Sequence, residues 1–283
     1  MTNRGGRAAV MALLCAVLLA GCAVRFVYNQ LDWLVPWYLE DYIELDGPQK
    51  DLFKKRLDAY LDWHRHQQLP LYANFLNQVA DEAEKGLTRD NIATIQARTE
   101  QLAQAMIERL KPDMLDLFAM ASDEQVRDLF KKFDEDNAQY RRDNIEVSEK
   151  EQRRQRQKEI IHYAERWTGD LNNKQRKLIA DWSSRFELMG EEIADTRIAW
   201  QEEFHRILLL RHDRPAYDKA FSQLLDFPGF GRSPGFQRKL DHNQEILVDL
   251  YLALERSLTH SQREHMVNKL RSYANDFRAL AAQ

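Results

Sequence analysis

Cysteine is almost absent from this chain of 283 residues, which contains only Cys15 and Cys22. Glycine and proline are also scarce, with ten and seven residues, and no stretch alternates apolar and polar residues as a half-buried strand does. The apolar run from Ala8 to Leu19 is too short to cross a bilayer as a helix. These absences argue against a disulfide-stapled scaffold, a β-rich fold and a spanning helix. They predict an all-α protein held together by its apolar core.

The N-terminus has the pattern of an export signal, because Arg4 and Arg7 precede the apolar run. The run ends in Leu19-Ala20-Gly21-Cys22, which resembles the lipobox of bacterial lipoproteins. The resemblance implies that residues 1–21 are a cleaved signal peptide and that Cys22 is acylated. Two or three acyl chains would tether the protein firmly to a membrane. An ordinary secretory signal is the alternative interpretation.

The residue after the lipobox and the charge balance bear on location and partners. Ala23 follows Cys22 where Asp would favour the inner membrane, so we expect an outer-membrane protein that faces the periplasm. The chain has 41 basic and 45 acidic residues, a net charge of −4 at pH 7. This mildly acidic balance argues against a nucleic acid partner.

One short phrase recurs five times and has the pattern of a helix beginning. A Thr, Ser, Asn or Asp at the N-cap accepts a backbone N–H, and an amide three residues later reaches back to the N–H of the cap. The copies are Leu45-Asp46-Gly47-Pro48-Gln49, Leu87-Thr88-Arg89-Asp90-Asn91, Ala121-Ser122-Asp123-Glu124-Gln125, Leu171-Asn172-Asn173-Lys174-Gln175 and Leu258-Thr259-His260-Ser261-Gln262. We therefore expect a helix to begin at each of these places.

The stretch between Cys22 and the first copy is the most aromatic in the chain. It contains Tyr28-Asn29-x-Leu31-x-Trp33-Leu34-x-x-Trp37-Tyr38, and Leu61-x-Trp63-His64 follows later. Together these residues resemble an uncharacterised family of proteobacterial α-helical lipoproteins. The resemblance implies the fold and the location but no activity, because none is assigned to that family. We expect four aromatic side chains to pack into the body, with contact with lipid headgroups as the alternative: Tyr28, Trp33, Trp37 and Tyr42.

The complete form L-T-x-x-Q occurs once, at residues 258–262. It is similar to the repeated motif of small periplasmic stress chaperones, which implies chaperone-like binding of unfolded envelope proteins. This chain departs from those proteins, which are much shorter, basic on the binding face and unlipidated. Recurrent helix capping is the interpretation that we favour.

Apolar residues at helical spacing divide the chain into three parts after the signal. Residues 22–133 and 160–283 carry apolar stripes and are predicted to form helical bundles. Residues 134–159 are rich in both charge signs and lack glycine and proline, so we expect one exposed connecting helix, with a disordered linker as the alternative. Within the third part, a 3.5-residue period from Ile179 to Ile207 predicts one continuous helix. The predicted architecture is an elongated bundle of long antiparallel helices.

Candidates for catalysis or metal binding are few. His64 and His66 are two residues apart on a predicted helix and point in different directions. Glu202-x-x-His205 occurs once, without the second copy that a metal site in a bundle needs. The loop at 227–235 lacks the spacing of a phosphate-binding loop. We therefore predict no metal, no cofactor and no enzymatic activity.

A contact surface is the remaining candidate. Positive charge is concentrated near the end of the connecting segment, at Arg153, Arg154, Arg156 and Lys158. A partner could dock there by charge, and a plain spacer is the equal alternative. The sequence thus predicts a lipid-anchored protein that binds an envelope protein of unknown identity, with chaperone-like binding as the alternative.

Overall fold

A computed structural model describes residues 21–227 and 229–283, with side chains from Val24 onward. The predicted signal peptide lies outside the described residues except for Gly21. Every regular element of the described part is helical, which confirms the predicted all-α fold. In chain order the helices are α2 (Gly21–Tyr28), α3 (Leu31–Leu39), α4 (Gly47–Trp63), the π-helical turn η1 (His64–Gln68), α5 (Leu69–Lys85), α6 (Arg89–Ala119), α7 (Asp123–Asn144), α8 (Glu149–Thr168), α9 (Asn173–Arg185), α10 (Gly190–Leu208), α11 (Arg214–Asp226), α12 (Pro234–Ser257) and α13 (His260–Ala281).

All five predicted helix starts are confirmed, and they begin α4, α6, α7, α9 and α13. In each, the side chain of the N-cap accepts the backbone N–H of the third helical residue, and the amide of that residue accepts the N–H of the cap. The five caps are Asp46, Thr88, Ser122, Asn172 and Thr259.

Four of the five capping amides also join helix starts in pairs. Gln49 Nε2 donates to Gln125 Oε1 at 2.9 Å, and Gln125 Nε2 donates back to Gln49 Oε1 at 2.6 Å. Each Nε2 also donates to the carbonyl two residues before the cap of the other helix, which is Met120 O for Gln49 and Glu44 O for Gln125. Because each Oε1 also accepts the N–H of its own cap, both amides use all their hydrogen-bonding positions. We call this arrangement a glutamine clasp.

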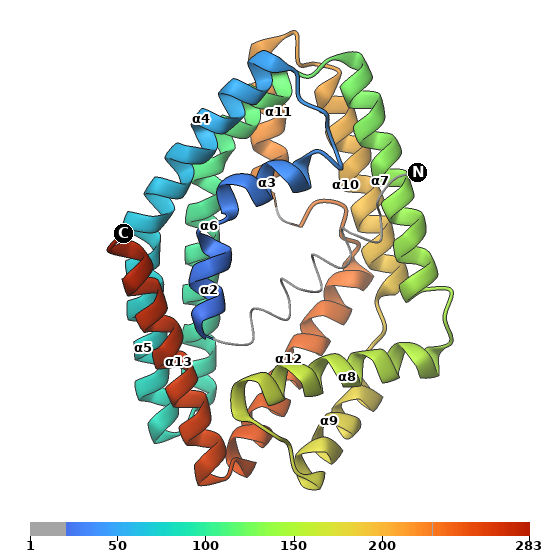
Figure 1. Ribbon diagram of the computed structural model, residues 1–283. Helices are drawn as coiled ribbons and strands as arrows, with labels where there is room; N and C mark the ends of the chain where they lie inside the picture. The colour runs from blue at the N-terminus through green and yellow to red at the C-terminus, as the bar shows by residue number, and fades with distance from the viewer. Residues whose placement is uncertain (1–20, 228) are drawn as a thin grey trace, which may run out of the picture.

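Gln175 and Gln262 form a second glutamine clasp with the same connections. Their Nε2 atoms donate to each other's Oε1 at 2.8 and 3.0 Å, and to Ser257 O and Asp170 O. The first clasp joins the starts of α4 and α7 and the second joins those of α9 and α13, at opposite ends of the molecule (Figure 1). The fifth amide, that of Asn91, donates instead to the side chain of Glu82.

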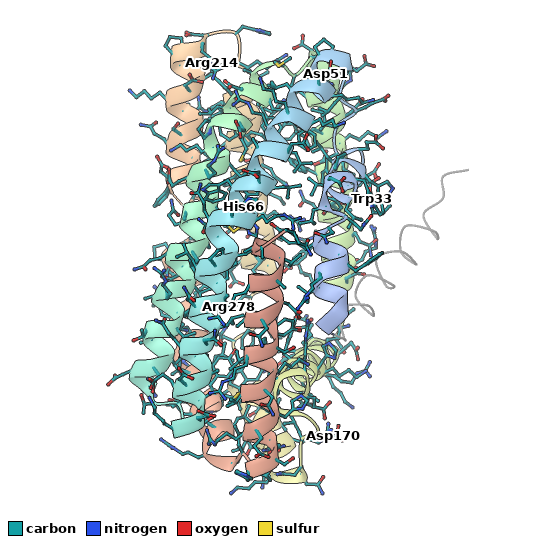
Figure 2. The ribbon with its side chains drawn as sticks, turned by 60° about the vertical axis from the view of Figure 1, so that its left-hand side comes forward. Trp33, Asp51, His66, Asp170, Arg214 and Arg278 are labelled. Atoms are coloured by element: carbon teal, nitrogen blue, oxygen red, sulfur yellow. The ribbon has the colours of Figure 1, made fainter. Side chains whose placement is uncertain are left out.

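The helices form an open frame (Figure 1). Along one side α4, η1 and α5 run end to end beside α6 and α13, while α7 and α10 form the opposite side. At the lower end of this view α8 packs on α9, which also packs on α12. α2 and α3 lie across the middle of the frame, and Figure 2 shows them at one edge of the turned body, with Trp33 on α3.

Separate apolar clusters hold the two ends of the frame. The upper cluster joins α4, α6, α7, α10 and α11 around the buried rings of Phe204 and Phe221. The lower clusters join α8, α9 and α12 around Trp182, and α5, α8 and α13 around Ala80. The upper cluster combines α4, α6 and α7 with α10 and α11. Residues 22–133 and 160–283 therefore do not pack as independent units.

Pro70 lies inside the rod formed by α4, η1 and α5, where the sequence predicts a kink or an interruption of the helix. Proline has no N–H for the carbonyl four residues earlier. The helix accommodates the missing N–H with the π-helical turn His64–Gln68, which ends two residues before Pro70. The predicted interruption of the α-helix is therefore confirmed, although the rod continues without a break. Single π turns inside α-helices are frequent at functional sites.

The prediction of one exposed helix over residues 134–159 is wrong. α7 ends at Asn144, and Ser148 begins a new helix by accepting the N–H of Glu151 at 3.3 Å. The two helices pack on different partners, α7 on α10 and α8 on α9 and α13. The charged segment is therefore a corner of the frame.

The prediction of one continuous helix from Ile179 to Ile207 is also wrong, because α9 ends at Arg185 and α10 begins at Gly190. Side chains of α12 bind the backbone at this break. Glu187 N donates to Asn243 Oδ1 at 2.9 Å, and Asn243 Nδ2 donates to Glu187 O at 2.8 Å. Lys239 donates to Leu188 O at 3.0 Å. The partners that stabilise the break come from a distant helix, so the local apolar period does not reveal it.

Replacing Gln175 by Leu is expected to lower the free energy of unfolding by about 3 kcal/mol, because it removes the partners of Gln262, Ser257 O and the Asn172 N–H. Chemical denaturation followed by circular dichroism measures the change. The control is Asn91→Leu, which removes the third-residue amide of a capping box outside the clasps and should cost about 1 kcal/mol. Equal losses in the two variants would contradict the role of the clasp.

Candidate functional site

A largely apolar cavity lies between α3, α4 and α6. Its volume is about 390 Å³. Pockets for small molecules commonly measure roughly 300–1,000 Å³. The cavity is lined by Leu31, Val35, Leu39, Leu52, Phe53, Arg56, Leu57, Tyr60, Leu61, His64, Met106, Leu110, Asp113, Met114, Leu117 and Phe118.

Each wall of the cavity is one face of a helix. Lining positions on α3, α4 and α6 recur mostly at steps of three and four residues, the spacing that places side chains on one side of a helix. The α4 wall extends from Leu52 to His64. At 1.5 Å per residue this wall is about 18 Å long, so the cavity is elongated along α4.

The two charged residues of the lining are paired with protein groups. Arg56 Nε lies 3.3 Å from Asp113 Oδ1, and Arg56 Nη2 lies 3.5 Å from Asp116 Oδ2. Arg109 also approaches Asp113, at 3.8 Å, and Arg214 pairs with Asp116 at 2.6 Å. Because these charges compensate one another, the lining does not favour a strongly charged ligand.

His64, the first residue of η1, is surrounded by aromatic rings at one end of the cavity. Tyr28 Oη and His64 Nδ1 form a hydrogen bond of 2.9 Å, and the two rings stack. The rings of Tyr60 and Tyr72 lie 6.1 and 5.5 Å from that of His64. Burial lowers the pKa of His64 and raises the pKa of Tyr60 to about 12. All these groups are therefore uncharged at neutral pH.

Polar contacts fix α2 between η1 and the end of α13. Arg65 donates to Leu280 O at 3.1 Å and to Asn29 Oδ1 at 2.9 Å, and its guanidinium lies over the ring of Tyr28. Arg25 pairs with the buried carboxylate of Asp276 at 2.7 Å. The segment that leads from Cys22 to the cavity therefore has a defined position on the body.

The aromatic residues near Cys22 divide between the core and the surface. Tyr28 lies in the aromatic cluster, and Tyr42 packs against the upper core, so the prediction of packing is confirmed for these two. Trp37 is half-buried, whereas Trp33 is 48% exposed. Cys22 itself lies in the first turn of α2, and its side chain is outside the described residues.

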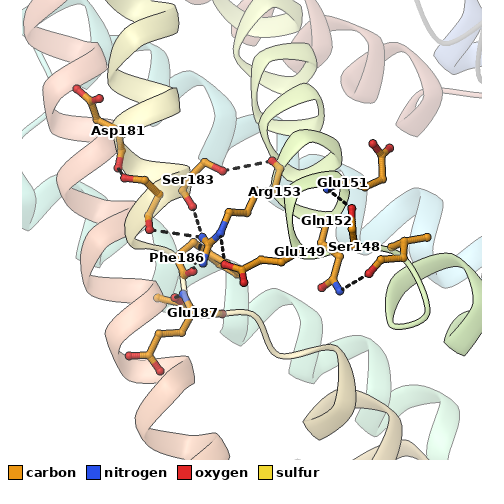
Figure 3. Close-up of polar contacts among 12 residues, drawn as sticks. Ser148, Glu149, Glu151, Gln152, Arg153, Asp181, Ser183, Phe186 and Glu187 are labelled. Carbon is orange, nitrogen blue, oxygen red and sulfur yellow. Dashed lines mark hydrogen bonds and ion pairs between the residues drawn. The ribbon is translucent and has the colours of Figure 1, made fainter.

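Arg153, predicted to belong to a contact surface, binds the end of α9 instead (Figure 3). Its Nη1 donates to Ser183 O at 2.6 Å and to Phe186 O at 2.9 Å. The last carbonyls of a helix lack partners within the helix, and an arginine can supply them. Arg153 therefore stabilises the break between α9 and α10 and is not free to bind a partner.

The other cationic residues of that predicted surface differ from Arg153 in their contacts. Arg154 pairs with Glu151 at 2.6 Å, and Arg156 lies over the ring of Phe186 at 4.8 Å. Lys158 is exposed. The four residues thus have different structural environments, although they are adjacent in the sequence.

Within residues 21–227 and 229–283, no group of three or more His, Cys, Asp or Glu side chains is arranged to hold a metal ion. His64 points into the aromatic cluster, while His66 is half exposed and contacts Asp62. In the same part of the chain, none of the helices has the length and apolarity of a membrane span.

The apolar stripe of α4 predicts a helix with one buried side, but it does not predict the cavity. The stripe on α4 is evident from its spacing, but only the packed structure shows that α3 covers it incompletely. The available signal was the four-residue spacing of Leu31, Val35 and Leu39, which gives α3 an aliphatic inner face.

Residues 41–230 match the model of a family described as "Family of unknown function (DUF6279)". The chain belongs to this family. The match confirms the resemblance to an uncharacterised family, and it spans the α4 and α6 walls of the cavity but begins after α3. Neither a curated protein nor a solved structure matches the chain.

Protonation of His64 is expected to destabilise the fold, because burial lowers its pKa below the value of 6.5 that it regains on unfolding. As the pH falls through this range, the unfolded chain binds a proton that the folded chain does not. The free energy of unfolding should therefore fall as the pH drops below about 7.5, by at most about 1.4 kcal/mol per pH unit for this one group.

Denaturation at several pH values measures this dependence. His64→Gln should flatten the decline, and the control His66→Gln, at the half-exposed neighbour, should retain it. The same slope in the wild type and in His64→Gln would show that His64 does not titrate differently in the two states.

Proposed function

We propose that this protein is a lipid-anchored protein of the proteobacterial envelope that binds an apolar ligand in the cavity between α3, α4 and α6. Its place would be the outer membrane, facing the periplasm. The cavity carries the proposal, because Leu, Met and Phe side chains dominate its lining and it is large enough for a small ligand. Such a lining retains apolar groups by the hydrophobic effect.

Binding fits this lining better than catalysis does. Its polar members are Tyr60, His64, Arg56 and Asp113, and the last two are paired with each other. The hydrogen bond of His64 goes to a tyrosine, not to a carboxylate that would orient it as a catalytic base. An envelope protein as a partner stays a prediction. The chaperone-like alternative gains no support from the capping phrase, because Gln262 is held in a clasp.

The anchor is supported by the lipobox resemblance and by the place of Cys22 in the chain. Cys22 lies in the first turn of α2, which is fixed on the body, and Leu31 in the cavity wall follows nine residues later. An acylated Cys22 would therefore hold the cavity close to the membrane.

Replacing Cys22 by Ser is expected to release the protein from the membrane fraction and to abolish metabolic labelling with a radioactive fatty acid. Cell fractionation and lipid labelling measure the two effects, and a density gradient distinguishes the outer from the inner membrane. The control is Cys15→Ser, since Cys15 would be removed with the signal peptide. A Cys22→Ser protein that still carries label would contradict the anchor.

Filling the cavity is expected to prevent binding of N-phenylnaphthylamine, a neutral dye that fluoresces in apolar surroundings. Titration of the purified Cys22→Ser chain should show saturable binding, and Leu110→Trp should weaken it at least about tenfold, or about 1.4 kcal/mol. The control is Ile107→Trp, at a residue of α6 that is 41% exposed and lies outside the lining.

Val35→Trp fills the cavity from α3 and provides a second test if Leu110→Trp fails to fold. Circular dichroism establishes whether each variant is folded. Undiminished dye binding by a folded Leu110→Trp or Val35→Trp variant would contradict the cavity as the binding site.

A further inference from the structure

α3 forms one wall of the cavity and follows α2, whose first turn contains Cys22. Its inner face contributes Leu31, Val35 and Leu39 to the cavity wall. Leu34 is the only buried residue among the nine of α3. A wall held by few buried groups is displaced at lower cost than a core helix.

Several large aromatic side chains of α2 and α3 are exposed. Phe26 is 59% exposed, Trp33 48% and Tyr38 49% (Figure 2 labels Trp33). The hydrogen bonds of Trp33 and Tyr38 go to Gln30 and Tyr42, which are close in the sequence, so these contacts do not bury the rings. Trp and Tyr concentrate at membrane–water interfaces, where part of the ring is apolar and part is polar.

These exposed rings lie within sixteen residues of Cys22. The proposed anchor would therefore bring this surface to the headgroups of the same membrane. α3 would then stand between the lipid and the cavity, with Trp33 on the side of the helix opposite the aliphatic residues that line the cavity.

The chemistry of the lining favours an acyl chain over a peptide. An extended peptide brings N–H and C=O groups that need partners when they are buried. Among the sixteen lining residues, Arg56 and Asp113 are paired with each other and His64 bonds Tyr28, so few groups remain to serve a backbone. An acyl chain has no such requirement, and the elongated shape along α4 fits a linear chain.

We propose that the cavity takes one acyl chain of a phospholipid from the membrane to which the protein is anchored, while the headgroup stays at the surface of α2 and α3. This inference names the ligand of the proposed binding site and rests on that proposal. The paired charges at Arg56 and Asp113 agree with it, because they offer no free charge to draw a headgroup inside.

Photocrosslinking in vesicles tests the inference. The lipoprotein is purified from cells grown without a photoreactive fatty acid, so its own anchor is unreactive. It is then reconstituted into vesicles of phosphatidylethanolamine and phosphatidylglycerol that contain a phospholipid with a diazirine near the end of one acyl chain. After illumination and digestion, mass spectrometry is expected to find lipid on peptides from the α4 and α6 walls, Leu52–His64 and Met106–Phe118.

Leu110→Trp and Val35→Trp should each lower the yield on these two peptides about tenfold, whereas Ile107→Trp should leave it unchanged. Flotation with the vesicles first establishes that each protein is anchored. Lipid found only on α2 and α3 in a floating, dye-binding protein would overturn the acyl-chain inference and leave the proposed function standing. If an apolar peptide displaced the dye from the protein and no lipid were crosslinked to α4 and α6, the cavity would be assigned to a protein segment instead.

Discussion

A buried side-chain amide needs partners for two N–H groups and for its oxygen, and this requirement governs the architecture of the frame. Gln49 and Gln125 meet it together at one end, and Gln175 and Gln262 meet it at the other. Each amide caps its own helix and also binds the chain that leads into the partner helix. The same four side chains therefore complete the capping boxes of their own helices and join these helices in pairs. An N-cap residue alone would supply only the first of these two functions.

The backbone at the corners of the frame follows the same rule. Where α9 ends, the exposed carbonyls and N–H groups are bound by Arg153 from α8 and by Lys239 and Asn243 from α12. Arg211 has the corresponding role at the end of α10, where it donates to Leu208 O at 2.8 Å. Residues that look like free surface charges in the sequence are thus needed to satisfy helix ends.

The cavity lies where α3 covers the facing sides of α4 and α6 only in part. Strong capping and the two cores fix the long helices, and Arg25 and Arg65 fix α2. α3 follows α2 in the chain and has one buried residue, Leu34. Its aliphatic side chains form one wall of the cavity, and space remains between them and α4 and α6. The site that we propose for a ligand is therefore built on two long helices and closed by a short helix with a single buried residue.

The sequence by itself determined the all-α class, all five capping boxes and the disturbance before Pro70. These features depend on residues within a few positions of one another, and their spacing is visible in the sequence. The break after α9, the corner after Asn144, the role of Arg153 and the pairing of the glutamines were decided only by the tertiary structure. Each depends on partners 30 or more residues away, or on how helices pack against different neighbours, and a local period contains no information on either. The cavity belongs to the same group, because an apolar stripe has the same spacing whether a neighbouring helix covers it fully or in part.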